Sequence, residues 1–287
     1  MTSAGTTEQG IYIGTSGYSY SEWVDAGFYP DGTHAANMLD HYIRMFGTTE
    51  LNYTWYQMPK APAVERMCAK VPDRFKFTAK LTRTMTHDIK KNQWRKEVIL
   101  YRQGIKPMIR TKKLLCVLIQ LPPYFKRTPE FRNYLAALLD ELSGLPLAVE
   151  FRHDSWVNEK VFSELERRKV TLVCVDEPGI PGLFPTLDVV TNPDLFYIRL
   201  HGRNARGWRT GNMQKQFDYN YNDWELKEWA ATIKESMMPE AGTGGIYFNN
   251  HVRGQAPKNA LRLITLLMAK GMGRSCNILR NRRHPAR

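Results

Sequence analysis

Short apolar runs recur along the chain every few tens of residues, and most of them end in a polar or charged residue. The eight runs read IYIGTSG from Ile11, TTELNYTWY from Thr48, FKFTAKL from Phe75, LLCVLIQLP from Leu114, PLAVEFRH from Pro146, VTLVCVDEP from Val170, LFYIRLHGR from Leu195 and GGIYFNNHV from Gly244. Helical periodicity separates them over residues 34–46, 61–70, 88–109, 128–142, 157–169, 223–238 and 257–272, whereas residues 179–194 predict a loop or a short irregular helix. Strands that alternate with helices predict βα units and a parallel sheet. We therefore expect an α/β fold, a single (β/α)₈ TIM barrel whose sixth unit is irregular.

Alternation of side chains along each run predicts which polar residues share the inside of the barrel. In PLAVEFRH, the apolar positions face the helices, so Glu150 and Arg152 point inward. The same alternation turns inward a further set of polar side chains, namely Glu50, Asn52, Thr54, Lys80, Gln120, Asp176, Arg199, His201 and Asn249. They lie at or near the C-terminal ends of their strands, where TIM-barrel enzymes hold their active sites. The sequence therefore predicts a polar, charged barrel mouth.

Burying so many charges is unfavourable before pairing recovers any of the free energy, at several kcal/mol per ion. Apolar layers would fill a barrel at a lower cost. A binding or catalytic site is the better interpretation of this mouth. The alternative is an internal salt-bridge network that only fixes the barrel geometry.

Composition is consistent with one large domain. The chain has 287 residues, of which 43% are hydrophobic, and contains no stretch rich enough in Pro, Gly or Ser to be a linker. No apolar run approaches the roughly 20 residues that span a membrane, and the N-terminus lacks the basic and apolar segments of a secretory signal. We expect a cytoplasmic protein with a barrel domain over residues 11–272, and flexible termini over residues 1–10 and 273–287, the second of them basic.

Positive charge is in excess and unevenly distributed. The chain carries 41 Lys and Arg against 28 Asp and Glu, which gives a net charge of +13. Eleven cations lie between Lys80 and Lys113 against two acids, and Arg203, Arg206 and Arg209 follow the seventh run, where barrels often hold phosphate. Such an excess attracts anionic partners, including nucleic acid and phosphorylated metabolites. The alternative for the segment after Lys80 is a solvated helix face.

Seven motifs carry a resemblance to a known family: GTSGYSYSEW, ELNYTWYQMP, FTAKLTRTMTH, LIQLPPYF, AVEFRHDSW, YIRLHGR and IYFNNHVRGQAPKNA. Together they resemble the YecE-like family, domain of unknown function seventy-two, over residues 11–267. The resemblance implies a TIM barrel and leaves the chemistry open. The positions that it carries over are Gly14, Ser16, Gly17, Glu50, Asn52, Tyr56, Lys80, His87, Gln120, Pro122, Pro123, Glu150, Arg152, His153, Trp156, Asp176, Arg199, His201 and Asn249. The sequence departs from the pattern in its basic segment after His87 and in HVRGQ after Asn250.

The inward side chains offer several catalytic roles. Glu50 and Glu150 face each other across the mouth and are predicted to act as acid and base. His87 and His201 are alternative proton carriers. Lys80, if its pKa is lowered, is a nucleophile for a Schiff base; if it stays charged, it holds a phosphate or carboxylate.

The remaining polar positions are predicted to bind substrate. The sequence assigns to this role Ser16, Asn52, Tyr56, Gln120, Arg152, His153, Asp176, Arg199 and Asn249. Ser16 lies in GTSGYS, whose glycines allow either an anion cradle or a tight turn without a ligand. Amide side chains in the set suit a polyhydroxylated or heterocyclic ligand. We expect an enzyme acting on a small anionic or sugar-like substrate, as a hydrolase, lyase or isomerase.

Two other functions remain open at this stage. The carboxylates and histidines of the mouth are a ligand set for a divalent metal in a phosphoesterase or sugar isomerase, although no HxH or HExxH spacing is present. The sequence requires no cofactor. The second alternative is a protein that binds nucleic acid or nucleotides through its basic surface.

Overall fold

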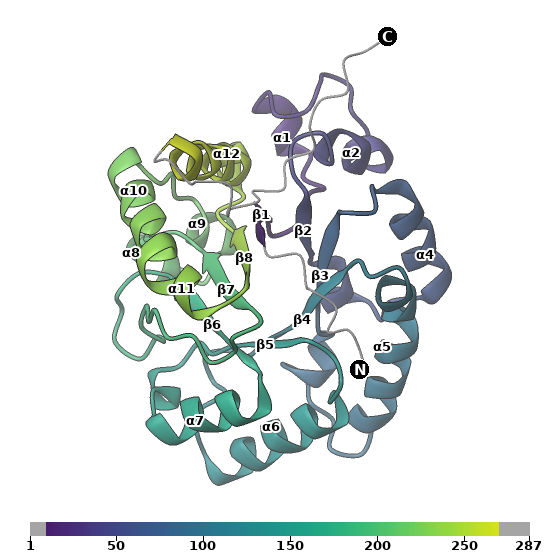
Figure 1. Ribbon diagram of the computed structural model, residues 1–287, viewed down its shortest axis with the longest axis vertical. Helices are drawn as coiled ribbons and strands as arrows, with labels where there is room; N and C mark the ends of the chain where they lie inside the picture. The colour runs from purple at the N-terminus through teal and green to yellow at the C-terminus, as the bar shows by residue number, and fades with distance from the viewer. Residues whose placement is uncertain (1–9, 270–287) are drawn as a thin grey trace, which may run out of the picture.

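Eight parallel strands form the ring of the barrel, and helices surround it (Figure 1). The computed structural model describes residues 10–269. The strands are β1 (Gly10–Thr15), β2 (Thr48–Leu51), β3 (Lys76–Lys80), β4 (Leu114–Gln120), β5 (Leu147–Glu150), β6 (Thr171–Asp176), β7 (Phe196–Leu200) and β8 (Thr243–Phe248). They are ordered β1-β8-β7-β6-β5-β4-β3-β2, so β2 to β8 pair with their neighbours in the chain and β1 pairs with β8, while a single bridge between Ser16 and Glu50 joins the ends of β1 and β2. The predicted (β/α)₈ architecture is confirmed.

Helices cover the outside of this ring. They are α1 (Glu22–Asp25), α2 (Ala35–Tyr42), α3 (Tyr53–Tyr56), α4 (Ala61–Lys70), α5 (Trp94–Arg110), α6 (Pro129–Glu141), α7 (Glu159–Arg168), α8 (Ala205–Trp208), α9 (Met213–Gln216), α10 (Asp223–Thr232), α11 (Met238–Glu240) and α12 (Gln255–Ala269). A π-helical turn, Ile233–Met237, joins α10 to α11. No helix lies between β6 and β7, which confirms the irregular sixth unit. None of the helices within residues 10–269 has the length and hydropathy of a membrane-spanning segment.

Local sequence signals explain several helix starts. Thr128 accepts a hydrogen bond from the backbone N–H of Phe131, and Pro129 occupies the first turn of α6, where its missing N–H leaves no donor unpaired. Asn222 and Glu225 form a reciprocal capping box on α10. Helix α5 begins at Trp94, not at residue 88 as predicted, because the backbone N–H groups of His87 and Asp88 donate to the carbonyl oxygen of Arg83 in a turn.

The second strand is shorter than its sequence pattern predicts. Pairing of β2 with β3 ends at Leu51, and the next residues form α3. Thr54 folds the chain over the strand end, since its hydroxyl contacts the carbonyl oxygens of Leu51 at 2.9 Å and Lys80 at 2.6 Å. Thr54 therefore fixes the turn between β2 and α3 and is not the inward-facing strand residue that the alternation predicted.

The ring is closed between β1 and β2 by side chains as well as backbone. Gly17, at a positive φ of 82°, donates its N–H to the carbonyl oxygen of Glu50 at 2.8 Å. Further down, the hydroxyl of Tyr42 accepts from the N–H of Thr15 at 2.9 Å and donates to the carbonyl oxygen of Thr48 at 3.1 Å. The buried phenol thus takes the place of a ladder hydrogen bond, which leaves no backbone group of this seam unpaired at that point.

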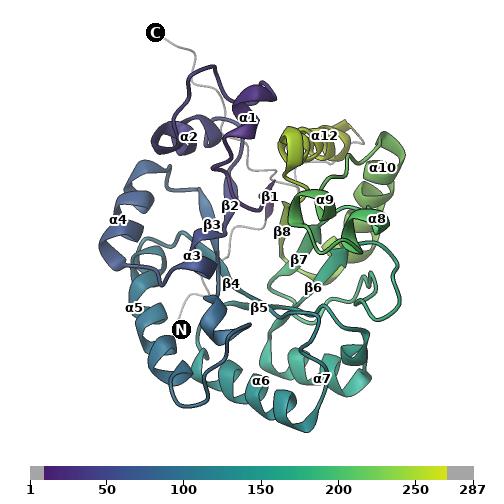
Figure 2. The ribbon, with the colours of Figure 1, turned by 180° about the vertical axis from the view of Figure 1, so that it is seen from behind.

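The interior below the mouth is filled by aromatic and small polar side chains. The rings of Tyr197 and Tyr247 stack with their centroids 5.0 Å apart. The Tyr247 hydroxyl lies 2.7 Å from Thr48 Oγ1 and accepts from Thr78 Oγ1 at 3.2 Å. These satisfied hydroxyls seal the barrel, so the open space of the interior is confined to the C-terminal end. In Figure 2 the short helices α3, α8 and α9, which follow β2 and β7, are seen at this end.

The predicted flexible termini, residues 1–10 and 273–287, lie almost entirely outside the described residues. Gly10 is described, and it is the first residue of β1. The basic tail after residue 272 is likewise outside the described part of the chain.

Candidate functional site

One arginine joins the two predicted catalytic carboxylates at the floor of the barrel mouth. Arg199 of β7 is buried, with 2% of its surface exposed. Its Nη2 donates to Glu50 Oε1 at 2.6 Å, and its Nη1 donates to Glu150 Oε2 at 2.6 Å. Tyr197 supports Glu50 from below by donating its hydroxyl to Oε2 at 2.8 Å. Glu50 and Glu150 therefore meet through a guanidinium and not through open space.

Ser16 belongs to the same floor. Its hydroxyl donates to Glu50 Oε1 and accepts from Arg199 Nη2 at 3.0 Å. The side chain is fully buried and does not line the cavity above. The GTSGYS turn consequently presents Ser16 to protein groups.

A second arginine holds the side of the mouth next to β5. Arg152 donates through Nε to Glu150, through Nη1 to Glu177 at 2.8 Å and through Nη2 to His201 Nε2 at 3.0 Å. His201 Nδ1 lies 3.0 Å from the amide nitrogen of Asn249. The three partners of Arg152 come from β5 and from the segments after β6 and β7, so this guanidinium fixes the mouth geometry.

Burial and charge set the protonation of this network. Burial would raise the pKa of Glu150, but the guanidiniums of Arg152 and Arg199 outweigh it and hold the pKa well below its ordinary value. Burial, together with the charge of Arg152, lowers the pKa of His201, so its ring is neutral. Burial raises the pKa of Glu177 to about 8, against the opposing charge of Arg152. At neutral pH, Glu150 is therefore ionised and Glu177 is largely protonated.

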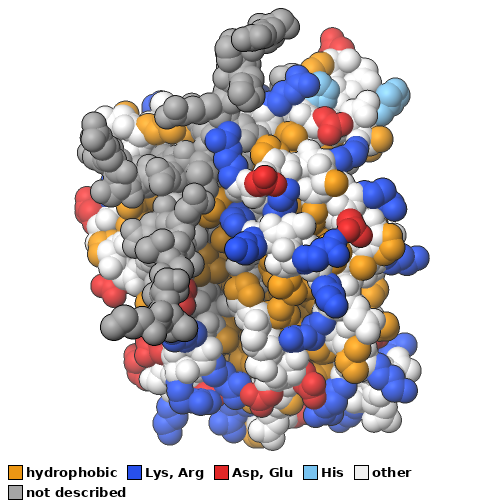
Figure 3. Space-filling view, turned by 45° about the vertical axis from the view of Figure 1, so that its right-hand side comes forward, with side chains coloured by type: hydrophobic (Ala, Val, Ile, Leu, Met, Phe, Trp, Pro, Cys, Tyr) orange, Lys and Arg blue, Asp and Glu red, His pale blue; other side chains and the backbone are white. Residues whose placement is uncertain are grey.

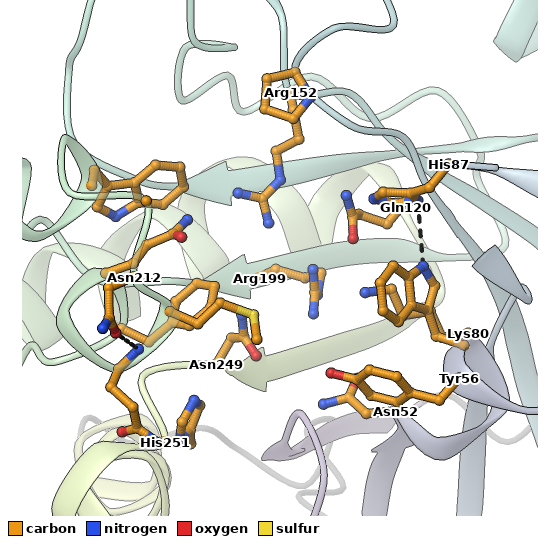
Figure 4. A pocket seen from close by; sticks show the side chains of 18 of the residues that line it. Asn52, Tyr56, Lys80, His87, Gln120, Arg152, Arg199, Asn212, Asn249 and His251 are labelled. Atoms are coloured by element: carbon orange, nitrogen blue, oxygen red, sulfur yellow. Dashed lines mark hydrogen bonds between the residues drawn. The ribbon is translucent and has the colours of Figure 1, made fainter.

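A cavity of about 740 Å³ opens above this floor. Among residues 10–269, its charged lining consists of Lys80, Arg152 and Arg199, without an Asp or Glu. The lining also contains aromatic and amide side chains together with two histidines, from Tyr20, Asn52, Trp55, Tyr56, His87, Gln120, Trp208, Asn212, Gln214, Gln216, Phe217, Asn249 and His251. Figure 4 shows Arg199 at the centre, with Lys80, Gln120 and His87 to one side and Asn249 and His251 to the other. The cavity is of the size that small-molecule sites have.

Lys80, at the end of β3, is the least satisfied cation of this lining. Its Nζ lies 5.1 Å from the ring centre of Trp55 and makes no hydrogen bond or ion pair with another described residue. Burial and then the charge of Arg199 lower the pKa of Lys80 to about 7. His87 packs edge-on against Trp55 with ring centres 4.9 Å apart, and burial lowers its pKa to about 4. A partly neutral lysine therefore stands beside a neutral histidine.

Two predicted substrate-binding residues lie elsewhere. Asp176 accepts from Arg203 Nε at 2.8 Å and from Trp229 Nε1 at 2.7 Å, and it does not line the cavity. His153 also lies outside the cavity lining, where its Nδ1 accepts from the backbone N–H of Ser155 at 3.1 Å. Arg203, predicted to hold phosphate, is likewise engaged with Asp176. The side chains of Asp176 and His153 thus make hydrogen bonds within the protein outside the cavity.

Comparisons with known proteins agree with this architecture. Residues 12–282 match the model of a family described as protein of unknown function DUF72. The chain belongs to the DUF72 family. It is similar to UPF0759 protein YunF of Bacillus subtilis (strain 168), with 28% identity over 271 residues, which cover 90% of this chain and 94% of the relative. It also resembles UPF0759 protein YecE of Escherichia coli (strain K12), with 28% identity over 63% of this chain and 64% of that one.

A solved DUF72 structure shows the same fold. The crystal structure of a DUF72 family protein from Thermotoga maritima MSB8 superposes with a TM-score of 0.82 and 33% identity, covering 90% of this chain and 99% of that chain. Most of the polar DUF72 motif positions named from the sequence lie in two places in this mouth, and Asp176 and His153 lie outside both. Glu50, Glu150 and Ser16 lie in the floor, whereas Asn52, Tyr56, Lys80, His87 and Gln120 line the cavity.

Several cavity residues were missed by the sequence reasoning on this DUF72 chain. Tyr20, Phe217 and His251 line the cavity from loops and Trp208 from α8, where strand alternation gives no signal. Glu177 follows the last residue of β6, and alternation assigns it to the opposite face from Asp176. The one available signal was the aromatic content of the segment after β7, which the basic residues of that segment obscured.

Several cations of the basic segment after Lys80 pair with acidic side chains. Arg83 pairs with Asp88 at 2.7 Å, Lys91 in the turn before α5 with Glu130 at 2.9 Å, and Arg95 of α5 with Glu141 at 3.1 Å. Lys113 is buried and donates to two backbone carbonyl oxygens at 2.8 Å. Figure 3 shows Lys and Arg side chains spread among acidic, apolar and other side chains on the face that it presents.

No set of three or more His, Cys, Asp or Glu side chains within residues 10–269 converges to hold a metal ion. Glu50, Glu150 and His201 approach one another, but their polar atoms face Arg152 and Arg199. The predicted divalent-metal alternative therefore lacks a ligand cluster in the described part of the chain.

Proposed function

We propose that this protein is an enzyme that binds a small anionic substrate in the barrel mouth and moves a proton through Lys80. The observation that carries the proposal is the charge of the cavity: Lys80, Arg152 and Arg199 line it and no acidic side chain does. The carboxylates that balance these cations lie beneath or behind them. An anion entering the cavity meets cationic groups in a partly desolvated place, where their attraction is stronger than in water.

The walls favour a substrate with a flat face. Tyr20, Trp55, Tyr56, Trp208 and Phe217 surround the cavity. Faces of aromatic rings pack against sugar and heterocyclic rings, and amide side chains fix such rings by hydrogen bonds. The amides of Asn52, Gln120 and Asn249 are placed to supply those bonds. These features support a sugar-like or heterocyclic substrate that carries an anionic group.

Lys80 has the properties of a general base. A catalytic base is most effective when its pKa lies near the working pH, and burial lowers the pKa of Lys80 to about 7. Arg152 and Arg199 stand in the same cavity and stabilise negative charge that develops when a proton is removed. Proton removal of this kind is common to lyases and isomerases, and in hydrolases it activates water.

Glu50 and Glu150 have a supporting role in this proposal. Each binds Arg199, and Glu150 also binds Arg152, so their oxygens are occupied. They hold the two guanidiniums at the cavity rather than exchanging protons with substrate. His201 acts similarly through its contact with Arg152.

The test is a comparison of matched ligand pairs by isothermal titration calorimetry, using glucose 6-phosphate against glucose and AMP against adenosine. We expect glucose 6-phosphate or AMP to bind, and the matching neutral compound, glucose or adenosine, to bind at least about tenfold more weakly. Lys80→Met and Trp55→Leu should weaken that binding, whereas Lys91→Met, in the turn before α5, should not.

The opposite result would favour a nucleic-acid binding protein. Equal affinity for charged and neutral members, together with oligonucleotide binding lost when Lys90, Lys91, Arg95 and Lys96 are changed to Met, would overturn the enzyme proposal. Salt dependence separates the two readings, because a surface that contacts many phosphates loses affinity steeply as salt rises.

A further inference from the structure

Two lysines of this barrel, the buried Lys113 and the half-buried Lys80, differ in how their ammonium groups are held. Lys113 Nζ donates to the carbonyl oxygens of Cys68 and Val71 at 2.8 Å each and lies 3.6 Å from Asp73. Lys80 Nζ has no such partner among the described residues, although it lies in a mouth with three carboxylates. Desolvating an ammonium group without hydrogen bonds is costly, so a position that maintains it calls for a functional explanation.

The carboxylates nearest to Lys80 are all bound to arginine. Glu50 and Glu150 bind Arg199, and Glu177 binds Arg152. No acidic group is left to serve as counter-ion for Lys80, and two guanidiniums share its cavity. The surroundings therefore favour the free amine, which is the nucleophilic form of lysine.

The main chain that carries Lys80 is firmly held. Its carbonyl oxygen accepts from Thr54 Oγ1 at 2.6 Å and from the Tyr101 hydroxyl at 3.3 Å, and β3 pairs with strands on both sides. The side chain passes the indole of Trp55 and ends in the cavity (Figure 4). A rigid strand thus presents an unpaired amine to whatever the cavity binds.

We propose that Lys80 forms an imine with the carbonyl carbon of an anionic aldehyde or ketone held by Arg152 and Arg199. This inference rests on the proposed function and names its substrate class: carbonyl compounds that carry a carboxylate or phosphate. The flat walls accommodate the planar imine, and the guanidiniums bind the anionic group.

The step is balanced without an oxidant or reductant. The amine nitrogen bonds to the carbonyl carbon, the C=O π bond breaks, and the oxygen takes a proton from the nitrogen to give a carbinolamine. The nitrogen lone pair then forms the C=N bond, and the hydroxyl group takes a proton from solvent and leaves as water, so the nitrogen keeps its remaining hydrogen and the product is the protonated imine. Neutral His87, which packs on the same indole as Lys80, is positioned to relay protons. The protonated imine withdraws electrons from the adjacent C–H or C–C bond, as a lyase or isomerase requires.

The test traps the imine by reduction. The full-length protein is incubated with limiting pyridoxal 5′-phosphate, an anionic aldehyde with a flat ring, then treated with sodium borohydride, whose hydride converts C=N to a stable amine. Intact mass and peptide mapping locate the label. We expect one adduct, at Lys80, that is absent in Lys80→Met and unchanged in Lys91→Met. Pyridoxal, which lacks the phosphate, should label Lys80 at least about tenfold more slowly.

Each outcome separates this inference from the proposed function. Label distributed over exposed lysines, with Lys80→Met labelled like the unchanged protein, would overturn the imine. If phenyl phosphate still binds by calorimetry in that case, anion binding in the mouth stands and only the covalent step fails. If phenyl phosphate does not bind either, both proposals fail. A thermal stability of both Met variants that is no lower than that of the unchanged protein excludes unfolding as a cause of lost label.

Discussion

Arg199 and Lys80 are both cations of the barrel mouth, and they differ in what surrounds them. Arg199 is enclosed by two carboxylates, a serine and a tyrosine-supported floor, so each of its nitrogens has a partner. Lys80 has only the face of Trp55. Burial acts on both, but the carboxylates raise the pKa of Arg199, whereas Arg199 itself lowers the pKa of Lys80. The same network therefore stabilises the charged form of Arg199 and, through the charge of Arg199, destabilises the charged form of Lys80.

That difference suggests a structural role for Arg199 and a chemical role for Lys80 in the same barrel mouth. A saturated ion network has little capacity to exchange protons, because moving one proton leaves an uncompensated charge. An amine without partners can gain or lose a proton with little change around it. We therefore look for reactivity at Lys80 and for geometry at Arg199.

Removing the guanidinium should have the largest effect. Arg199→Met leaves Glu50 buried without a cationic partner and Glu150 with Arg152 as its remaining arginine, and we expect a loss of about 3–5 kcal/mol in the free energy of unfolding. Urea denaturation measures it. Adding Glu50→Gln and Glu150→Gln to the same chain should restore much of the loss.

The matched control is Arg262→Met, which breaks a surface pair with Asp223 and should change stability little. If Arg199→Met proved as stable as the control, the floor would not be the closed ion network that its contacts indicate.

Removing the lysine should have the opposite sign. Burial lowers the pKa of Lys80 from 10.5 to about 7, so between these values the folded chain binds fewer protons than the unfolded chain. Stability then rises with pH across that window, and below pH 7 the full penalty is present. Lys80→Met should abolish this rise and stabilise the protein near neutral pH by about 2 kcal/mol.

Thermal denaturation of Lys80→Met and Lys91→Met at a series of pH values above neutrality provides the measurement. A slope that survives in Lys80→Met would show that the lysine is protonated and paired, which would remove the contrast with Arg199.

The fold was largely predictable from sequence, and the reason lies in particular runs. LLCVLIQ and PLAVE carry enough apolar residues to be read as strands, and Gly, Pro and polar residues separate them from helices. The run from Thr48 was overextended, because alternation continues through Asn52 and Thr54 after pairing with β3 has ended. Strand ends depend on tertiary pairing, which no local pattern contains.

The site was predictable only in part. Alternation identified Glu50, Glu150 and Arg199 as inward, but it does not say whether an inward carboxylate faces a cavity or an arginine from another strand. The residues that β2, β5 and β7 bring together are far apart in the chain. His153 was named from the family resemblance alone, and it lies outside the cavity lining, after the end of β5.

The smallest effect is expected at Glu177. Like Arg199 it has a charged partner, Arg152, and like Lys80 its pKa is shifted toward the neutral form by burial. Burial raises its pKa from 4.5 to about 8, so between these values the folded chain holds a proton that the unfolded chain has released. Stability from this group is complete at low pH and is lost as pH rises toward 8. Glu177→Gln should remove that slope, while the net change near pH 8 stays at about 1 kcal/mol because the lost attraction to Arg152 offsets the relieved burial.

Glu164→Gln is the control of opposite sign, since hydrogen bonds from Arg167 and Arg168 lower the pKa of Glu164 to about 2 and its contribution is lost only as pH falls. Chemical denaturation from pH 5 to pH 9 distinguishes the two, and a Glu177→Gln profile identical to that of the unchanged protein would place Glu177 with the ionised, paired carboxylates of the floor.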